Sequence, residues 1–539
     1  MFRTLLAAML FAASLAAAAA VNPLVSVQWL QGKLGAEDVL VIDTSPTPMH
    51  AAGHIPGAVP ANLYVAGFHM QSAAQLETRL QAWGITPEKK IVIYDQGGTN
   101  MATWLFFELY HYGFPEANLH VLDGGFAKWE EVGGAVTKDP TPTPAKGAFR
   151  ITNVREEVRT RMPEFMVASG DRANNVLVEA LEPESHFGDT KWFDKAGHIP
   201  HAVMWPNGDF YNPDKTFKSS EEIRRMTAYL GIKPDQLVHS HCGGGVAATV
   251  PFFALKFISG HDKVKVYKES QLEWLKDDRD LPFWTYDAPY MKRDAAWLNG
   301  WNQRMIRMFG VSGVSIVDVR TADAYKQSHV PWALNVPAEV FRANLRDPAK
   351  LAALLGPAGV DASHEAVIVS DGGLTPNAAL AFLALERAGQ KKVSVLMESV
   401  DDWGLKGFMI TKDPTIVGAP KTPQDHAVPP ANYVANVKAG TLADDGRRVP
   451  AHYPRVILAS GKKTPGKAPE GKVIHVPYTE LLNANGTPKP ANEIWKVLAK
   501  AGVPRYAEII CVSEDLGEAA VSYFVLKLMG YPDVKVAAA

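Results

Sequence analysis

Cys242 is the residue of this chain whose surroundings are best suited to covalent chemistry. It lies in the string LVHSHCGGGVAATV, between a strand-like apolar run and an amphipathic helix that begins near Val246. Backbone N–H groups in a glycine loop can point at an anion, and a helix N-terminus adds partial positive charge. Both effects favour the thiolate, which is the nucleophilic form of the side chain. The sequence therefore predicts an activated cysteine nucleophile, held by the backbone N–H groups of Gly243, Gly244, Gly245, Val246 and Ala247.

A buried, inert thiol is the alternative for any single cysteine, since cysteine is among the most buried residue types. The strand, glycine loop and helix around Cys242 favour chemistry, because reactive cysteines occupy such electropositive positions. Cys511 lies inside the apolar run AEIICVSED, where the inert interpretation is favoured. The chain has 2 cysteines, so no disulfide framework is indicated.

The composition fits an ordinary globular chain of several domains. The chain has 539 residues, of which 47% are hydrophobic, enough for several cores of the usual size. Its 55 basic and 57 acidic side chains nearly balance, and the sequence has no basic block or aromatic-basic stripe. Nucleic acids and anionic membranes are therefore not expected as partners.

An apolar N-terminal stretch, TLLAAMLFAASLAAAAA, follows Arg3 and ends in small residues before Val21. This pattern is typical of a secretory signal peptide and predicts cleavage after Ala20. An uncleaved anchor is the alternative, but the stretch is short and alanine-rich for a membrane span. We expect residues 1–20 to be removed and the mature protein to be exported, to the periplasm in a Gram-negative host.

A short motif recurs along the chain. AGHIPGAVPANLY at 52–64 is repeated as AGHIPHAVMWP at 196–206 and as QSHVPWALNVP at 327–337. Each copy is followed by an apolar strand, one polar residue, glycines and a helix, and a degraded fourth copy lies near the C-terminus. Self-similarity of this kind indicates a repeated structural unit. The polar residues assigned to the loop position are Asp95, Cys242, Asp371 and Glu514, so only the second copy has a thiol.

A longer period suggests how the copies are grouped. The string TKDPT occurs at 137–141 and again at 411–415, which indicates a duplicated two-domain unit. The predicted domains are residues 21–145, 146–290, 291–425 and 426–539. Short β-branched strands alternate with helical segments, which predicts an α/β fold in which each domain is a mostly parallel sheet flanked by helices. Ligands of such sheets bind at the carboxyl ends of the strands, where Cys242 lies.

The GHIPGA-type motif, the cysteine loop between strand and helix, and the string LDGGFAKW at 122–129 resemble the rhodanese family of sulfurtransferases. The resemblance implies four rhodanese-like domains, of which the second is catalytic and the other three are inactive. It implies that the Cys242 thiolate takes the outer sulfur of thiosulfate or 3-mercaptopyruvate and becomes a persulfide. A thiol, cyanide or partner-protein acceptor would then remove that sulfur, in two-step covalent catalysis that requires no metal or organic cofactor.

The choice of donor stays open. Loops that begin Cys-Gly-x-Gly-Val resemble those of mercaptopyruvate sulfurtransferases, and the basic side chains typical of thiosulfate-preferring members do not follow Cys242. The mercaptopyruvate type also implies a Ser two residues after the cysteine, where this chain has Gly244. It implies a His and an Asp from the first domain, for which His54 and Asp43 have a fitting spacing. A structural pair that fixes the loop after the first strand is the alternative for these two residues.

Positive charge near the cysteine loop is a second open point. Family members often have Asp-x-Arg after the first strand, as at Asp318-Val319-Arg320, whereas the second domain has Glu179-Ala180-Leu181. Other side chains that could tune the thiol, supply charge or line the cleft are His241, Lys191, Lys195, His198 and Trp205. A solvated surface is the alternative for the two lysines, and strand alternation could turn His241 away from Cys242.

Two other classes of function have different requirements. A cysteine phosphatase needs an arginine to close the loop, because a bidentate guanidinium matches phosphate geometry. The HCx5R spacing places Ala248 at that position, which argues against this class. A non-turnover persulfide carrier, or a scaffold for an exported partner protein, is the alternative to an enzyme, since most copies lack the thiol. An enzyme would cycle freely with small acceptors, whereas a carrier would load once and stall.

Overall fold

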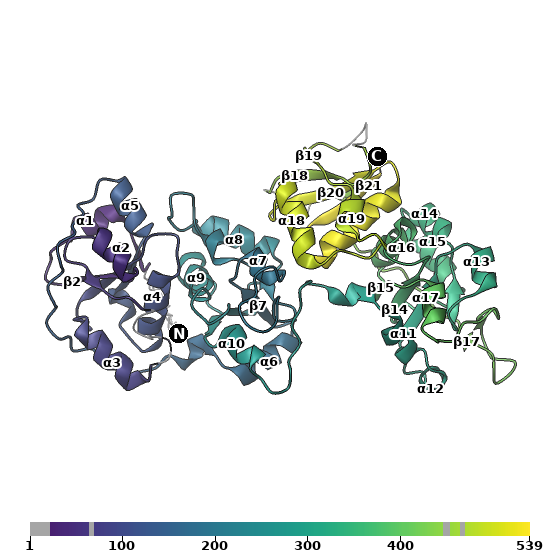
Figure 1. Cartoon of the computed structure of the whole chain (residues 1–539), viewed down its shortest axis with the longest axis horizontal. Coiled ribbons are helices and arrows are strands. Elements are labelled where there is room, and N and C mark those ends of the chain that lie inside the picture. The colour runs from purple at the N-terminus through teal and green to yellow at the C-terminus, as the bar shows by residue number, and fades with distance from the viewer. Residues whose placement is uncertain (1–21, 64–68, 70, 446–452, 464–468, 539) are drawn as a thin grey trace, which may run out of the picture. The chain divides into compact units, whose positions relative to one another are not determined.

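The computed structural model describes residues 22–63, 69, 71–445, 453–463 and 469–538 (Figure 1). The predicted signal peptide, with its cleavage site after Ala20, lies outside the described residues and stays a prediction. Within these ranges, no helix is long and apolar enough to cross a bilayer. The chain forms two compact units, one from the described residues up to 159 with 208–220 and 249–264, and one from 160–207, 221–248 and 265 onward.

The first sheet comes from the N-terminal part of the chain. Its strands are β1 (Leu24–Val25), β2 (Val39–Asp43), β3 (Val59–Pro60), β4 (Lys90–Tyr94) and β5 (Leu119–Leu122). They are parallel and ordered β1-β5-β4-β2-β3. The accompanying helices are α1 (Val27–Gln31), α2 (Thr47–Ala52), α3 (Ala73–Ala82), α4 (Met101–His111) and α5 (Gly125–Glu131).

The second sheet carries the cysteine loop. Its strands are β6 (Arg159–Thr160), β7 (Asn175–Glu179), β8 (Val203–Met204), β9 (Leu237–His241) and β10 (Val264–Tyr267), ordered β6-β10-β9-β7-β8. The strand β7 is parallel to both of its neighbours. The accompanying helices are α6 (Met162–Gly170), α7 (Pro183–His186), α8 (Ser220–Tyr229), α9 (Thr249–Phe253) and α10 (Ser270–Leu275).

The third sheet has the strands β11 (Lys292–Arg293), β12 (Val314–Asp318), β13 (Ala333–Asn335), β14 (Glu365–Val369) and β15 (Lys392–Leu396), ordered β11-β15-β14-β12-β13. Its helices are α11 (Ala295–Trp301), α12 (Arg304–Met308), α13 (Ala322–Gln327), α14 (Ala338–Asn344), α15 (Pro348–Leu355), α16 (Pro376–Arg387) and α17 (Val400–Leu405). A two-stranded ribbon, β16 (Ile416–Val417) and β17 (Ala427–Val428), follows.

The fourth sheet has the strands β18 (Arg455–Ala459), β19 (Lys472–His475), β20 (Glu508–Ser513) and β21 (Val534–Ala538), ordered β19-β18-β20-β21. Its helices are α18 (Ala491–Ala501) and α19 (Leu516–Leu528). Where the other three sheets have a short first strand, this one has a single parallel bridge between Leu442 and Val536.

The repeated strand order confirms the predicted fold class, an α/β chain of mostly parallel sheets flanked by helices (Figure 1). Numbered within each copy, the first three sheets all have the order 1-5-4-2-3. Because each crossover returns to a parallel neighbour, every loop after a central strand opens at the carboxyl edge of its sheet. The domain boundaries drawn from the sequence stay a prediction.

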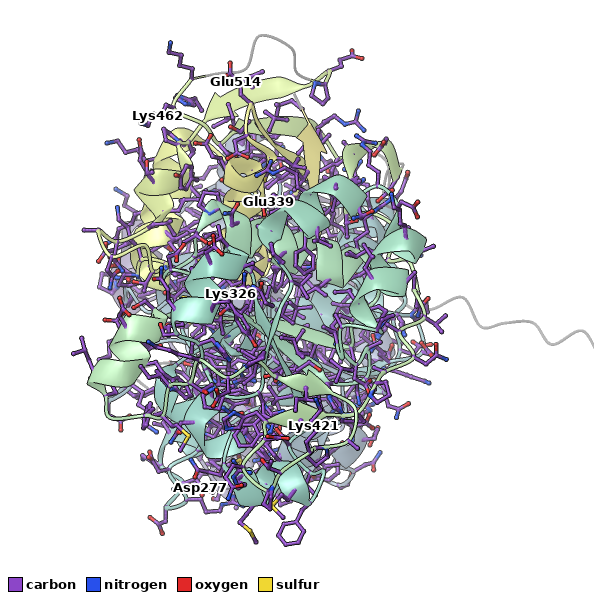
Figure 2. The ribbon with its side chains drawn as sticks, turned by 90° about the vertical axis from the view of Figure 1, so that its right-hand side faces the viewer. Asp277, Lys326, Glu339, Lys421, Lys462 and Glu514 are labelled. Atoms are coloured by element: carbon purple, nitrogen blue, oxygen red, sulfur yellow. The ribbon has the colours of Figure 1, made fainter. Side chains whose placement is uncertain are left out.

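Sheet register corrects the assignment of the loop position in two copies. Asp43 pairs with Tyr94, Glu179 with His241, Asp318 with Val369, and Ala459 with Val512. The residues that follow the second member of each pair are Asp95, Cys242, Ser370 and Ser513. The residues named from the sequence, Asp371 and Glu514, lie one position further on and are exposed, as Figure 2 shows for Glu514. In the third copy the strand β14 ends at Val369, one residue earlier than its composition suggests, whereas in the fourth copy β20 extends through Ser513 itself. The second copy remains the one with a thiol at this position.

The helix after each loop is buried, which fixes the loop from its C-terminal side. Helix α16 (PNAALAFLALER) is apolar almost all round and is buried accordingly. It begins at a Thr375 cap, whose hydroxyl accepts a hydrogen bond from the N–H of Ala378. It packs against α19, with the rings of Phe382 and Phe524 4.8 Å apart. In the other unit α4 packs against α9 through Phe106 and Phe253, also 4.8 Å apart. A duplicated two-domain unit predicts this equivalent pairing of loop helices.

Candidate active site

Cys242 lies directly after β9, at the carboxyl edge of the second sheet, and its side chain is buried. The N–H of Gly245 donates a hydrogen bond to its sulfur, with N and Sγ 3.1 Å apart. Burial raises the pKa of the Cys242 thiol above its ordinary value, while the backbone N–H groups of Ala248, Gly244, Gly245 and Ala247 act to lower it. Three of the five loop residues named from the sequence, Gly244, Gly245 and Ala247, thus direct N–H groups at the sulfur, but burial outweighs the effect of the N–H groups on the pKa of the free thiol.

Ser270 fixes the backbone of the cysteine from the start of α10. Its hydroxyl accepts a hydrogen bond from the N–H of Cys242 at 3.0 Å and donates one to the carbonyl of Tyr267 at 2.7 Å. Its backbone has φ of 53°, in the left-handed region that non-glycine residues rarely adopt. The next two N–H groups of α10, from Gln271 and Leu272, donate to the carbonyls of Cys242 and Gly243. The cysteine loop is thus held on both sides of the sulfur, at the cost of a strained residue.

The three loop glycines have different structural roles. Gly245 has φ of 85°, and a Cβ added to it would lie 1.9 Å from the carbonyl oxygen of Lys268. Only glycine fits this position without displacing the backbone. Gly243 and Gly244 have ordinary φ values and open space where a Cβ would be. The structure therefore requires Gly245 and leaves Gly243 and Gly244 free to vary.

The equivalent loop of the first sheet binds its own carboxylate. Asp95 accepts hydrogen bonds from the N–H of Gly97 at 2.8 Å and of Ala102 at 3.0 Å, and from the Thr99 hydroxyl at 2.5 Å. A loop of this fold thus holds an anion in the position that Cys242 occupies in the second sheet. The comparison supports thiolate or persulfide stabilisation as the chemistry for which the loop geometry is suited.

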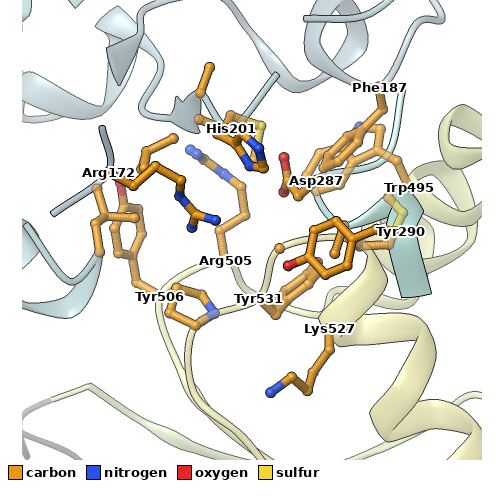
Figure 3. A pocket seen from close by; sticks show the side chains of 18 residues that line it. Arg172, Phe187, His201, Asp287, Tyr290, Trp495, Arg505, Tyr506, Lys527 and Tyr531 are labelled. Carbon is orange, nitrogen blue, oxygen red and sulfur yellow. The ribbon is translucent and has the colours of Figure 1, made fainter. Parts of the chain in front are cut away.

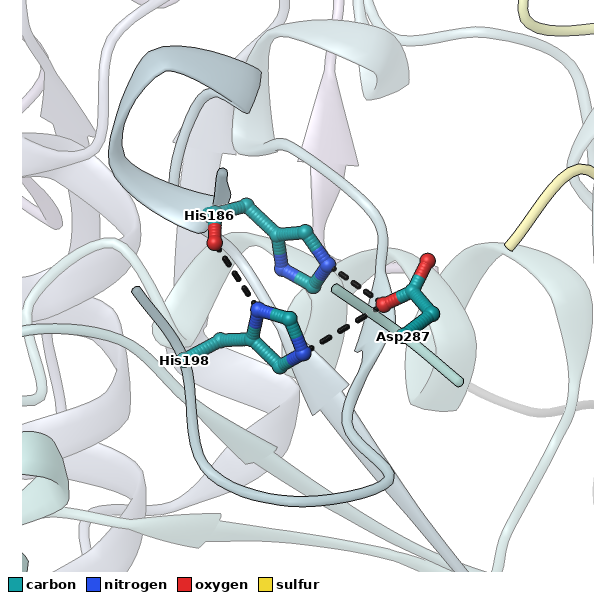
Figure 4. Close-up of side chains that lie close together, drawn as sticks. All are labelled: His186, His198 and Asp287. Atoms are coloured by element: carbon teal, nitrogen blue, oxygen red, sulfur yellow. Dashed lines mark hydrogen bonds and ion pairs between the residues drawn. The ribbon is translucent and has the colours of Figure 1, made fainter. Parts of the chain in front are cut away.

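A buried chain of charged groups stands beside the cysteine loop. Glu179, the last residue of β7, contacts Nδ1 of His186. The Nε2 of His186 lies 2.7 Å from a carboxylate oxygen of Asp287, as Figure 4 shows. Burial lowers the pKa of His186, but Asp287 and Glu179 raise it further, to about 9. His186 is therefore an imidazolium between two carboxylates at neutral pH. The side-chain amide of Gln271 donates to Glu179, and the N–H of Gln271 donates to the Cys242 carbonyl at 3.1 Å. The chain of contacts from Asp287 thus ends at the cysteine loop.

The histidine of the recurring motif makes the same contacts in the three clear copies of that motif. His198 stacks on His186 at 3.7 Å, His54 on His50 at 3.8 Å, and His329 on Tyr325 at 3.7 Å. In each copy its Nδ1 bonds to the carbonyl of the residue on which it stacks. Burial and the nearby His186 lower the pKa of His198 to about 4, so its ring is neutral. This placement fits the structural alternative, because the same contacts occur in copies without a thiol.

Asp43 and His54 do not bond to each other directly. Asp43 accepts from Nδ1 of His50 at 2.7 Å, and His54 stacks on the face of the His50 ring. His50, the partner of Asp43, was not named from the sequence. It is seven positions after Asp43, as His186 is seven positions after Glu179. That shared spacing is the signal by which both histidines could have been found in the sequence.

The other side chains named from the sequence are distributed between core and surface. His241 is buried against the ring of Phe165, and burial lowers its pKa to about 3, so it supplies no positive charge to the thiol. Lys191 is exposed, and Lys195 contacts Asp280. Trp205 is fully buried and donates its backbone N–H to the Glu179 carbonyl at 2.9 Å. Three residues that contribute to the loop, Ser270, Gln271 and Asp287, carry no motif, because their roles depend on long-range packing.

His186, His198 and Asp287 are the described residues whose ligand atoms lie near enough to one another to hold a metal ion. The two imidazole planes are within 1° of parallel, so their Nε2 lone pairs run side by side rather than converging on one point. His186 would also have to lose a proton whose pKa is raised to about 9. This arrangement fits a proton-bridged ion pair better than a metal centre.

Comparison with known proteins identifies a known domain family in two of the copies and relatives that match about half of the chain. The rhodanese-like domain model matches residues 26–132 and 302–406, the first and third copies. The chain is 30% identical over 246 residues to a putative thiosulfate sulfurtransferase, SseB, of Mycobacterium tuberculosis, which covers 42% of this chain and 83% of the relative. It is 29% identical over 281 residues to a probable 3-mercaptopyruvate sulfurtransferase of Pseudomonas aeruginosa, covering 48% and 96%. It is 28% identical over 270 residues to the sulfur carrier protein TtuD of Thermus thermophilus, covering 47% and 93%.

Proposed function

The chain belongs to the rhodanese family of sulfurtransferases, and on this basis we propose that it transfers sulfane sulfur through a persulfide on Cys242. The observation that carries the proposal is the loop itself, in which the Gly245 N–H lies 3.1 Å from Sγ and three further N–H groups act on the thiol. No other copy has a cysteine at the equivalent position, where Asp95, Ser370 and Ser513 stand.

The first half-reaction loads the cysteine. The thiolate attacks the outer sulfur of thiosulfate, the sulfur–sulfur bond of the donor breaks, and sulfite leaves with the bonding electron pair. With 3-mercaptopyruvate the carbon–sulfur bond breaks instead, and pyruvate leaves as an enolate that takes up a proton. The persulfide that remains is anionic, and the loop N–H groups stabilise it as they would the thiolate.

The second half-reaction unloads it. A thiolate or cyanide acceptor attacks the terminal sulfur, the persulfide bond breaks, and Cys242 recovers its thiolate. The two half-reactions share one covalent intermediate, so ping-pong kinetics are expected. The strained Ser270 and the contacts of α10 would keep the loop in place through both steps.

The donor class can be tested at Gly244. Resemblance to mercaptopyruvate sulfurtransferases places a serine here, and Gly244 has space for a Cβ without a clash. We expect Gly244→Ser to raise kcat/KM for 3-mercaptopyruvate relative to thiosulfate. Gly243→Ser, which also has open space, is the matched control and should leave the ratio unchanged.

A carrier role is the second candidate, and the buried sulfur favours it. Cys242 is 3% exposed, which would protect a persulfide from small acceptors until a dedicated partner protein arrives. The relative named as a sulfur carrier protein supports the same class for this chain.

We also propose that the mature protein is exported after cleavage at Ala20. N-terminal sequencing of the secreted protein tests this.

Sulfur transfer by the mature protein decides between these functions. Thiosulfate and 3-mercaptopyruvate are compared as donors, with cyanide and dithiothreitol as acceptors, alongside Cys242→Ser. Turnover that Cys242→Ser abolishes supports the enzyme, and the preferred donor identifies its subclass. Loading of one sulfur atom on Cys242 by mass spectrometry, without turnover, supports the carrier. An unmodified Cys242 with both donors would contradict sulfur transfer altogether.

A further inference from the structure

Gln271, in the first turn of α10, is buried beside the cysteine loop and makes two bonds there. Its N–H donates to the carbonyl of Cys242 at 3.1 Å, and its side-chain amide donates to one carboxylate oxygen of Glu179. The other oxygen of Glu179 contacts the ring of His186, which is bonded in turn to Asp287. Gln271 therefore joins the backbone of the cysteine to a buried network of charged groups.

Little of this network is open to solvent. The side chains of Glu179 and His186 are fully buried, and that of Asp287 is 20% exposed. Figure 3 shows Asp287 at the wall of a cavity of about 350 Å³. Gln271 lies at the other end of the network and is 2% exposed. Bulk water is therefore not available to replace its amide as a hydrogen-bond donor to Glu179.

The first and third copies have an apolar side chain at the position of Gln271. In the first copy it is Phe126, whose N–H donates to the Asp95 carbonyl at 2.8 Å, as the N–H of Gln271 does at the cysteine loop. In the third copy it is Val400, since a buried tryptophan follows three residues later in each of the three copies. Phe126 and Val400 are buried in hydrophobic clusters. Among the three clear copies, the polar side chain thus occurs in the one that has the thiol.

The carboxylate at the end of the second strand of each sheet shows the same difference. Asp43, in the first copy, accepts from His50 at 2.7 Å. Asp318, in the third, accepts from Arg320 at 2.7 Å. The second copy has the longer Glu179, which reaches both its local partner and the amide of α10. The apolar residues of the other two copies have no side-chain donor for such a bond, so this link between β7 and α10 accompanies the thiol.

We propose that Gln271 is a positioning residue for sulfur transfer, which holds the Cys242 backbone so that the loop N–H groups point at the sulfur. Its bond to Glu179 anchors the first turn of α10. The same turn carries Ser270, whose hydroxyl accepts from the N–H of Cys242 at 3.0 Å, so both the N–H and the carbonyl of the cysteine are bonded to one anchored turn. N–H groups stabilise an anion only while their geometry is maintained. The inference rests on the proposed function, because the anion concerned is the thiolate or persulfide of Cys242.

Gln271→Met in the full mature protein tests the proposal, since methionine has a similar length but no amide. The ultraviolet absorbance of the Cys242 thiolate is titrated without donor, and the titration of Cys242→Ser is subtracted. We expect the midpoint to rise by about 0.5 or more, because the loop N–H groups that lower the pKa of the thiol would be less well aimed. An unfolded fraction would shift the midpoint down, toward the ordinary pKa of a thiol, so the direction of the change separates lost positioning from lost stability.

Loading of the cysteine gives the second measurement, with whichever of the two donors loads the wild-type protein. Gln271→Met should lower the maximal rate of persulfide formation about tenfold and change the donor concentration for half-maximal rate by less than about twofold, because positioning acts on the reacting sulfur rather than on donor binding. Glu179→Asp should give the same changes, since aspartate bonds to a histidine at the same spacing in the first copy but is too short to reach Gln271. The matched control is Gln236→Met, which removes a buried glutamine amide beside the opposite end of β9 and should leave the midpoint and the rate unchanged.

An unchanged midpoint and rate in folded Gln271→Met would overturn the proposal. An equal shift in Gln236→Met would also overturn it, because any lost buried amide would then have the same effect. If Gln271→Met does not fold, Glu179→Asp decides, and wild-type values in that variant would contradict the link. The proposed function fails separately, when the wild-type protein forms no persulfide, and the thiolate titration still tests in that case whether Gln271 positions the loop.

Discussion

Gly244 and Gly245 are neighbours in the cysteine loop, yet their surroundings predict opposite responses to a methyl group. In Gly245→Ala the Cβ would lie 1.9 Å from the Lys268 carbonyl oxygen, in a left-handed backbone with φ of 85°. We expect a loss of at least about 2 kcal/mol in stability, because the strain and the clash add. Sulfur transfer should fall by two orders of magnitude or more, since the Gly245 N–H would move from Sγ. Thermal unfolding and persulfide formation measure both effects, with Gly244→Ala as the control that keeps them near wild type.

The buried thiol predicts how the rate of sulfur transfer depends on pH. Burial raises the pKa of Cys242, so the thiolate fraction should still be increasing with pH above the ordinary range of a thiol. We expect kcat/KM for thiosulfate to rise continuously from pH 6 to about 9. Cys511→Ser is the control and should have the same profile, since Cys511 is buried in β20. A plateau below pH 7 would show that the thiolate is already formed in the free enzyme.

At the level of single residues, the sequence indicated a candidate nucleophile but not the residues that hold it in place. The order of strand, cysteine, glycines and helix is local, and it predicted the position of Cys242 at the end of β9. The position of Ser370 rather than Asp371 depends on pairing of Val369 with Asp318, a register that composition does not report. The contacts of Ser270 and Gln271 with the loop are likewise long-range, so no nearby pattern indicates them.

At the level of elements, the ion pair between β7, α7 and the segment after α10 predicts a pH-dependent stability. The pKa of His186 is raised from 6.5 to about 9, so its pairing stabilises the folded chain fully below pH 6.5 and is lost as pH rises through 9. The shift corresponds to on the order of 3 kcal/mol. We expect the melting temperature of the protein to fall between pH 7 and 9.5, and His186→Gln to remove most of that fall.

His198 does not contribute to the fall in melting temperature between pH 7 and 9.5, because its pKa is lowered to about 4 and its ring stays neutral above pH 6.5. His241→Asn is the control for the experiment. The pKa of His241 is lowered to about 3, so its ring is neutral in the folded chain and, above pH 7, mostly neutral in the unfolded chain as well. This variant should therefore lower the melting temperature equally from pH 7 to 9.5 and keep the wild-type slope over that range. The same slope in His186→Gln would mean that another group titrates.

The elements themselves were largely predictable because their periodicity is strong. Alternation of apolar strands with amphipathic helices predicted parallel α/β sheets, and the recurring histidine motif predicted a repeated structural unit. The first three sheets share one strand order, as expected of such a repeat. The fourth sheet was the least predictable, since its motif is lost and its first strand is reduced to the bridge of Leu442 with Val536. Its core survives because α19 and β20 remain apolar.

At the scale of the whole molecule, the second unit joins residues far apart in the sequence. Phe187, Ala288 and Met291 share one hydrophobic core with residues of the third and fourth sheets. The Tyr229 hydroxyl bonds to backbone groups of Arg505 and Ala507. A repeat identifies the copies but not which of them pack together, so these contacts could not be read from the sequence. They indicate that the second half of the chain supports the copy with Cys242 structurally.

A shortened chain, residues 22–291, tests that support. It keeps Cys242, its loop and Asp287, but Phe187 loses Trp495 and Tyr229 loses its partners in the fourth sheet. We expect a loss of about 3 kcal/mol from exposed apolar area and broken hydrogen bonds, which lowers the melting temperature by roughly 5–10 °C. Persulfide should still form on Cys242 at low temperature, because every contact described for the loop lies within 22–291. Full stability in the shortened chain would contradict a supporting role, and loss of persulfide formation in a folded shortened chain would assign the second half to the reaction itself.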